Sequence, residues 1–113
     1  MLQIRADVRD GVCVFRLDGT LTTVEVPYLK TEVRAALEKG CVDIVLDLAG
    51  TEFVDSAGLG AFVALHKAAL VGGGALRIAS PRPGVRALFD LTRLHRVLTI
   101  DAPDVPSGEA AAP

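Results

Sequence analysis

The sequence predicts a single α/β domain with a mixed, mostly parallel sheet of about five strands, which opens with an antiparallel hairpin and packs against three main helices. Segments with alternating apolar residues are followed repeatedly by segments whose apolar residues recur at spacings of three and four. An Asp10-Gly11 turn separates the first two alternating segments. The chain has 113 residues, half of them apolar, which is enough for one domain with its own core.

Charge and hydropathy exclude several functional classes. The formal net charge is -2 and the twelve basic residues are scattered, so nucleic acid is not an expected direct partner. No apolar run approaches the roughly 20 residues that span a bilayer, and residues 1–10 lack the pattern of a secretory signal. We therefore expect a cytoplasmic protein without a membrane partner.

The two cysteines lack the spacing of a metal or redox motif. Cys13 lies in an alternating apolar run and Cys41 opens the next strand. We expect buried free thiols, and neither a metal site nor a cofactor.

The first third of the chain reads as a hairpin and a helix. Residues 2–8 and 12–17 alternate on either side of the turn, and residues 18–20 (DGT) are expected to break the second strand. Thr22 and Glu25 have the spacing of a capping box, and a helix is expected to start near Thr23 or Val24. Its apolar stripe comprises Val26, Leu29, Val33 and Leu37.

The middle of the chain is a strand followed by a helix. Residues 42–48 alternate, and the next helix begins within residues 55–60 (DSAGLG). Its predicted buried stripe comprises Leu59, Phe62, Val63, His66, Ala69 and Leu70. The segment 55–60 therefore brings a carboxylate, a hydroxyl and two glycines to a helix N-terminus.

The last third adds a short strand at residues 75–79, a helix beginning at Pro83 and a final strand within residues 94–100. We assign residues 1–100 to the domain and expect residues 101–113, with their prolines and small side chains, to form a disordered tail. Loops after parallel strands share one sheet edge, so residues 18–23, 49–56 and 80–83 should meet.

Enzymatic interpretations find little support. The DGT of residues 18–20 resembles part of a haloacid dehalogenase motif, but Arg16 stands where the nucleophilic aspartate is needed. Gly58 and Gly60 lack the third glycine of a dinucleotide loop, and residues 72–74 (GGG) lack the Lys-Ser/Thr of a phosphate loop.

A serine hydrolase is a further alternative. It would use Ser56 with His66 or His95, but no nucleophile elbow is present. Ser56 is also a good N-cap residue, and a helix N-terminus suits a phosphate group.

The segment FVDSAGLGAF resembles the STAS domain of bacterial anti-sigma factor antagonists. VDIVLDL precedes it, and GGALRIASP and VRALFDLTRL follow, so the resemblance extends to about Ile100. It implies a STAS-like α/β fold and a protein that is not itself an enzyme. It also implies a partner, an anti-sigma factor with serine kinase activity that phosphorylates Ser56 and is released by that phosphorylation, while a separate phosphatase restores binding.

The resemblance also identifies the expected partner-binding residues. Asp55, Gly58 and Gly60 are expected to shape the loop around Ser56, and the neighbouring docking surface is expected to include Thr22, Thr23 and Thr51.

Two departures from the family pattern keep an alternative open. The family's Gly-x-Leu-Asp is Gly-Thr-Leu-Thr at residues 19–22, so Thr22 replaces an acidic residue, and no final helix is expected after Asp101. The alternative is a STAS scaffold that is not phosphorylated, or a regulatory subunit of a stress-sensing or lipid-transport assembly.

Overall fold

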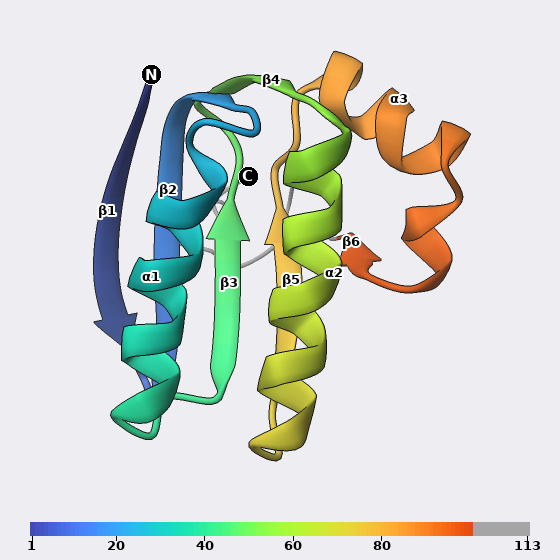
Figure 1. Ribbon diagram of the computed structural model, residues 1–113. Coiled ribbons are helices and arrows are strands. Elements are labelled where there is room, and N and C mark those ends of the chain that lie inside the picture. The colour runs from blue at the N-terminus through green and yellow to red at the C-terminus, as the bar shows by residue number, and fades with distance from the viewer. Residues whose placement is uncertain (101–113) are drawn as a thin grey trace.

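A mixed sheet forms the centre of the fold (Figure 1). The computed structural model describes residues 1–100. Its strands are β1 (Leu2–Arg9), β2 (Val12–Leu21), β3 (Asp43–Asp47), β4 (Thr51–Val54), β5 (Ala75–Ala79) and β6 (Thr99–Ile100). The order is β1-β2-β3-β5-β6, and β4 pairs with the end of β2. Among the strands of residues 1–100, only the β1–β2 pair is antiparallel, so the predicted fold class is confirmed.

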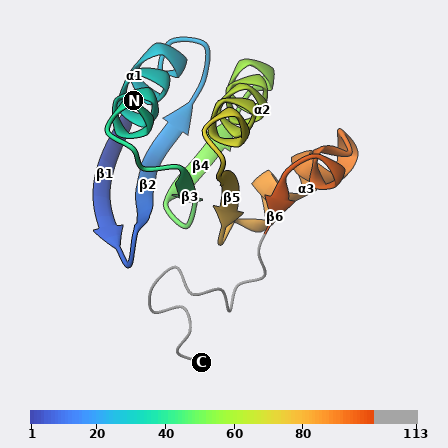
Figure 2. The same cartoon turned by 90° about the horizontal axis from the view of Figure 1, so that it is seen from below.

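The helices are α1 (Val26–Glu38), α2 (Ser56–Val71) and α3 (Pro83–Leu91), followed by a 3-10 turn, η1 (Leu94–Arg96). Figure 2 shows α1 and α2 on the same face of the sheet, with α3 beyond β5. The predicted start of α3 at Pro83 is confirmed. The prediction of a strand over residues 94–100 is wrong except at residues 99–100, because residues 94–96 form the 3-10 turn. Leu94 and Leu98, four residues apart, both pack against the core. The predicted tail lies outside the described residues.

The hairpin has the predicted turn, because both Asp10 (φ 53°) and Gly11 (φ 82°) adopt positive φ. The predicted break at residues 18–20 is wrong. β2 pairs with β3 up to Arg16 and with β4 from Gly19 to Leu21, and the β2–β4 ladder shifts register between Gly19 and Thr20. The sequence did not reveal β4, which lies within the predicted loop at residues 49–56.

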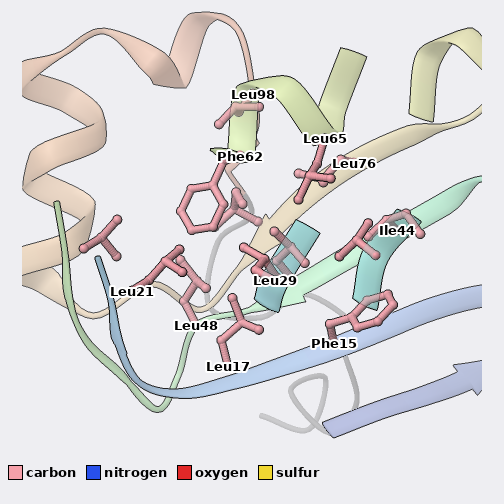
Figure 3. Packing of buried hydrophobic residues seen from close by; sticks show 14 of the residues in the cluster. Phe15, Leu17, Leu21, Leu29, Ile44, Leu48, Phe62, Leu65, Leu76 and Leu98 are labelled. Atoms are coloured by element: carbon pink, nitrogen blue, oxygen red, sulfur yellow. The ribbon is translucent and has the colours of Figure 1, made fainter. Parts of the chain in front are cut away.

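The main core lies between the sheet and α1 and α2 (Figure 3). Phe62 is fully buried and stacks on Phe89 with ring centroids 6.0 Å apart. The predicted stripe of α2 is partly wrong, since Leu65 is buried and Leu70 is 52% exposed. Apolar residues surround most of this helix, so spacing alone did not identify its buried face.

Cys13 and Cys41 form a disulfide, so the predicted free thiols are wrong. The parallel pairing of Cys13 with Ile44 brings the end of the α1–β3 connection beside the start of β2, and the two Cα atoms are 6.4 Å apart. The bond lies at the end of the sheet opposite the N-terminus of α2 (Figure 1).

Candidate functional site

Asp55 joins two loops at the carboxyl end of the sheet. One oxygen, Oδ2, accepts hydrogen bonds from the backbone N–H of Thr23 (3.1 Å) and from its hydroxyl (3.4 Å). The third loop also approaches, since Arg82 Nε donates to the carbonyl of Ala49 at 3.0 Å. The predicted meeting of the three loops is therefore confirmed.

Asp55 is also the N-cap of α2. Its Oδ1 accepts from the backbone N–H of Gly58 at 2.9 Å, in the extended conformation that N-cap residues adopt. This hydrogen bond, together with those from Thr23 and Ala57, lowers the pKa of Asp55. The carboxylate is therefore charged at neutral pH. The interpretation of Ser56 as the N-cap is wrong, because Ser56 is the first residue of the helix itself.

Ser56 is exposed at the start of α2. Its hydroxyl makes no hydrogen bond to any other part of residues 1–100. Asp55 caps the helix, so the hydroxyl of Ser56 is not needed for a capping hydrogen bond. The side chain is thus available to an enzyme or a partner protein.

Thr22 and Glu25 form a tight turn beside this site. Oε1 of Glu25 accepts from the backbone N–H (2.9 Å) and the hydroxyl (2.6 Å) of Thr22. This turn delays the start of α1 to Val26, two residues beyond the predicted Val24. The hydrogen bonds from Thr22 and the N-terminal ammonium group, 3.1 Å from Oε2, lower the pKa of Glu25 to about 2.

This low pKa predicts a pH dependence of stability. The unfolded chain binds a proton at Glu25 near its ordinary pKa of 4.5, whereas the folded chain does so only near 2. Stability from this group is therefore complete above pH 4.5 and is lost as the pH falls toward 2. Urea denaturation between these pH values should show a steeper loss of unfolding free energy for the wild type than for Glu25→Gln. Equal slopes would contradict the assignment.

The two glycines have different roles. A Cβ on Gly58 would lie 2.7 Å from Val54 Cγ1 and 2.9 Å from the carbonyl oxygen of Leu21, so only glycine fits there. Gly60 is exposed, and a Cβ on it would meet no atom within 4 Å. Gly60 lies four residues after Ser56, on the same side of α2.

This contrast predicts opposite effects of two alanine substitutions. Gly58→Ala should lower the free energy of unfolding by about 1–3 kcal/mol through the clash with β2. Gly60→Ala should raise it by up to about 1 kcal/mol, because alanine is the better helix former. Denaturant unfolding of both variants measures this, and a loss of stability in Gly60→Ala would contradict the geometry.

Thr51 does not belong to the exposed surface. It is completely buried and its hydroxyl donates to the carbonyl of Leu17 at 2.6 Å. The prediction that its side chain lines a docking surface is therefore wrong. The sequence did not reveal that residues 51–54 form a strand, in which Thr51 and Val54 face inward.

Two exposed apolar side chains were missed by sequence reasoning. Val24 is 81% exposed and follows Thr23, which is bonded to Asp55; Phe53 is 51% exposed and precedes Asp55 by two residues. Strand alternation alone would place Phe53 on the face of the buried Thr51; its exposure follows from the irregular ladder, in which Gly19 pairs with Thr51 and Thr20 with Phe53. We call the exposed set of Thr23, Val24, Phe53, Ser56 and Gly60 the Ser56 surface.

The histidines do not support serine hydrolase chemistry. His66 lies ten residues along α2 from Ser56, about 15 Å away at the helical rise, and its Nδ1 accepts from the N–H of Leu76. His95 lies against the carbonyl of Phe89. Residues 1–100 contain no group of three or more potential metal-ligating side chains, and none of their helices has the length and apolar character to span a membrane.

Comparisons with known proteins identify the family. Residues 3–103 match the STAS domain. The anti-sigma F factor antagonist of Paenibacillus polymyxa is 30% identical over 100 residues, which cover 88% of this chain and 86% of that protein. The anti-sigma-B factor antagonist of Bacillus subtilis is 30% identical over 103 residues, covering 89% and 94%.

A solved structure agrees with these relatives. The crystal structure of a protein assigned as an anti-sigma factor antagonist from Thermotoga maritima superimposes with a TM-score of 0.82 at 29% identity, covering 88% of this chain and 86% of that chain. The chain therefore belongs to the STAS-domain family of anti-sigma factor antagonists, whose members are regulatory proteins and not enzymes.

Proposed function

We propose that this protein binds a cognate anti-sigma factor through the Ser56 surface and that phosphorylation of Ser56 ends the binding. The anti-sigma factor is itself the serine kinase, and a separate phosphatase restores the unphosphorylated form. Binding of the anti-sigma factor frees its sigma factor for transcription. The protein acts in the cytoplasm, without direct contact to nucleic acid or membrane.

The observation that carries this proposal is that Asp55 and Ser56 have different roles. Asp55 caps α2 and joins the loops, whereas Ser56 is exposed without an internal hydrogen bond. Phosphorylation at Ser56 therefore breaks no contact that holds the fold. The apolar Val24 and Phe53 beside it supply the kind of exposed surface that protein partners bury.

The electrostatics of the site suit a switch. A phosphoserine adds close to two negative charges next to the ionised Asp55, and a partner that docks there must desolvate both groups. The N-terminus of α2 meets the new charge favourably, so the fold itself tolerates the phosphate. The modification should thus change affinity and leave the structure intact.

Glu25 places a carboxylate next to the departure at Thr22. The family pattern has a carboxylate at that position, and here the carboxylate of Glu25 lies 2.6 Å from the Thr22 hydroxyl. Its low pKa keeps it charged at neutral pH. A carboxylate therefore remains next to position 22, where it is paired with the N-terminal ammonium group at 3.1 Å.

Phosphate mapping tests the proposal. The protein is incubated with ATP and each candidate anti-sigma factor kinase of the same genome, and the phosphate is located by mass spectrometry. We expect one phosphate on Ser56 and none in Ser56→Ala. Ser80→Ala is the matched control, because Ser80 lies in a neighbouring loop at the same sheet edge, and it should be labelled like the wild type. Failure of every kinase to label Ser56 would favour the scaffold role.

A further inference from the structure

The outer edge of β1 presents an unpaired row of backbone groups. In the part of the chain that the structure describes, β1 pairs only with β2. Thr20 donates its N–H to the carbonyl of Met1 at 2.9 Å. Because hydrogen-bonded pairs alternate along an antiparallel ladder, the odd-numbered residues of β1 are the ones that hydrogen-bond to β2. The N–H and C=O groups of Ile4, Ala6 and Val8 therefore point away from the sheet.

We propose that a second copy of this chain pairs with β1 antiparallel across this edge, and that the two sheets join into one. The proposal does not depend on the switch at Ser56. A two-fold axis perpendicular to the sheet keeps the helices of both copies on the same face. Because the outward-pointing N–H and C=O groups belong to even-numbered residues, even-numbered residues of one copy must pair with even-numbered residues of the other. This condition leaves only a few registers to compare.

The charges of β1 select one register. Arg5 and Asp7 project from the sheet face opposite α1 and α2, because Leu2 and Ile4, which alternate with the odd-numbered residues, pack into the core on the helical face. With Ala6 on the two-fold axis, each Arg5 lies directly opposite an Asp7 of the other copy, whose Oδ2 also accepts from Arg9 Nε of its own strand at 2.8 Å. A shift of one step toward the N-terminus places Arg5 opposite Arg5, and the reverse shift places Asp7 opposite Asp7. Directly opposed like charges destabilise a strand pair, whereas opposite charges stabilise it.

The helical face gains from the same register. Val8 is 67% exposed at the strand's end, and in this register it lies opposite Ile4 of the other copy, which is only partly buried. Ala6 and Val8 also line a groove of about 640 Å³, which is bordered by Ala35 of α1 and by Lys39 just after this helix. A second β1 would cover the apolar floor of this groove. The same register thus pairs the free backbone groups, places opposite charges opposite each other and covers exposed apolar side chains.

The pairing leaves the Ser56 surface free. Figure 1 shows β1 at one edge of the sheet and the N-terminus of α2 across the sheet from it, where β4 ends. Each copy of the dimer would therefore expose its own Ser56. The dimer would present two partner-binding surfaces at its two ends.

Charge reversal tests this pairing by analytical ultracentrifugation. The wild type should shift with concentration from 11.8 kDa toward twice that mass. Arg5→Asp and Asp7→Arg should each weaken self-association by about tenfold or more, because each places like charges opposite one another at two positions. A mixture of the two variants should form heterodimers, since opposite charges then face each other again at both positions. Circular dichroism checks that each variant is folded.

Two results would overturn the proposal. A wild type that stays monomeric at every concentration excludes the dimer. Self-association of both single variants that equals that of the wild type, with no gain on mixing, excludes this register. Amide exchange provides an independent measurement: the N–H groups of Ala6 and Val8 should become protected at concentrations where the dimer forms, while phosphorylation of Ser56 should leave their protection unchanged.

Discussion

Ser56→Asp should bind the anti-sigma factor about 100-fold more weakly than the wild type, and Ser56→Ala should bind it as tightly as the wild type. A second carboxylate beside the ionised Asp55 places like charge in the docking surface, which costs several kcal/mol when a partner must desolvate it. A 100-fold loss corresponds to about 2.7 kcal/mol. Isothermal titration calorimetry with the purified anti-sigma factor gives the two affinities.

The control for this prediction is the stability of the fold. Ser56→Asp should unfold at the same denaturant concentration as the wild type or slightly higher, because an acidic residue is favourable in the first turn of a helix. Ser56→Asn has a similar size without the charge, and should bind almost as well as the wild type. A loss of affinity in Ser56→Asn equal to that in Ser56→Asp would assign the effect to shape and not to charge.

Reduction of the Cys13–Cys41 disulfide should lower the free energy of unfolding by about 3.5 kcal/mol. The bond joins two residues with a sequence separation of 28. Without it the unfolded chain gains conformational entropy, which lowers the free energy of the unfolded state by this amount. Urea denaturation with and without reductant measures the difference. The double variant Cys13→Ala/Cys41→Ala should not respond to reductant, and it serves as the matched control.

This measurement also bears on where the protein works. Disulfides are rare in the cytosol, where glutathione and thioredoxin keep thiols reduced. In the cytoplasm that we propose, the two cysteines would be held mainly as thiols, and the stability from the bond would be absent. Thiol trapping in intact cells distinguishes the two forms, and identical stability of the wild type with and without reductant would contradict the disulfide.

The sequence predicted those parts of the fold that local chemistry determines. The hairpin turn was predictable because Asp10 and Gly11 tolerate positive φ. The start of α3 at Pro83 was predictable because proline suits the first turn of a helix. The missed features depend on contacts between distant residues. The strand β4 exists because β2 continues past β3 and needs a partner, and Cys13 meets Cys41 only through the pairing of β2 with β3.

The candidate site shows the same division. The helix start within residues 55–60 was predicted, but the choice of Asp55 over Ser56 as N-cap depends on Thr23, which is 32 residues away in the sequence. Burial of Thr51 likewise depends on the carbonyl of Leu17. Exposure of Val24 follows from the turn that Glu25 closes. The contacts of Asp55 with Thr23 and of Thr51 with Leu17 are tertiary, and no spacing within the chain expresses them, whereas the turn between Thr22 and Glu25 is local and has the capping-box spacing.

The most direct measurement of the central claim is one titration of the anti-sigma factor with a single preparation of this protein in three states. The preparation is unphosphorylated, then fully phosphorylated on Ser56, then treated with a phosphoserine phosphatase. We predict tight binding, a loss of about 100-fold, which corresponds to 2.7 kcal/mol, and full recovery. Equal affinity in the first two states would contradict the switch.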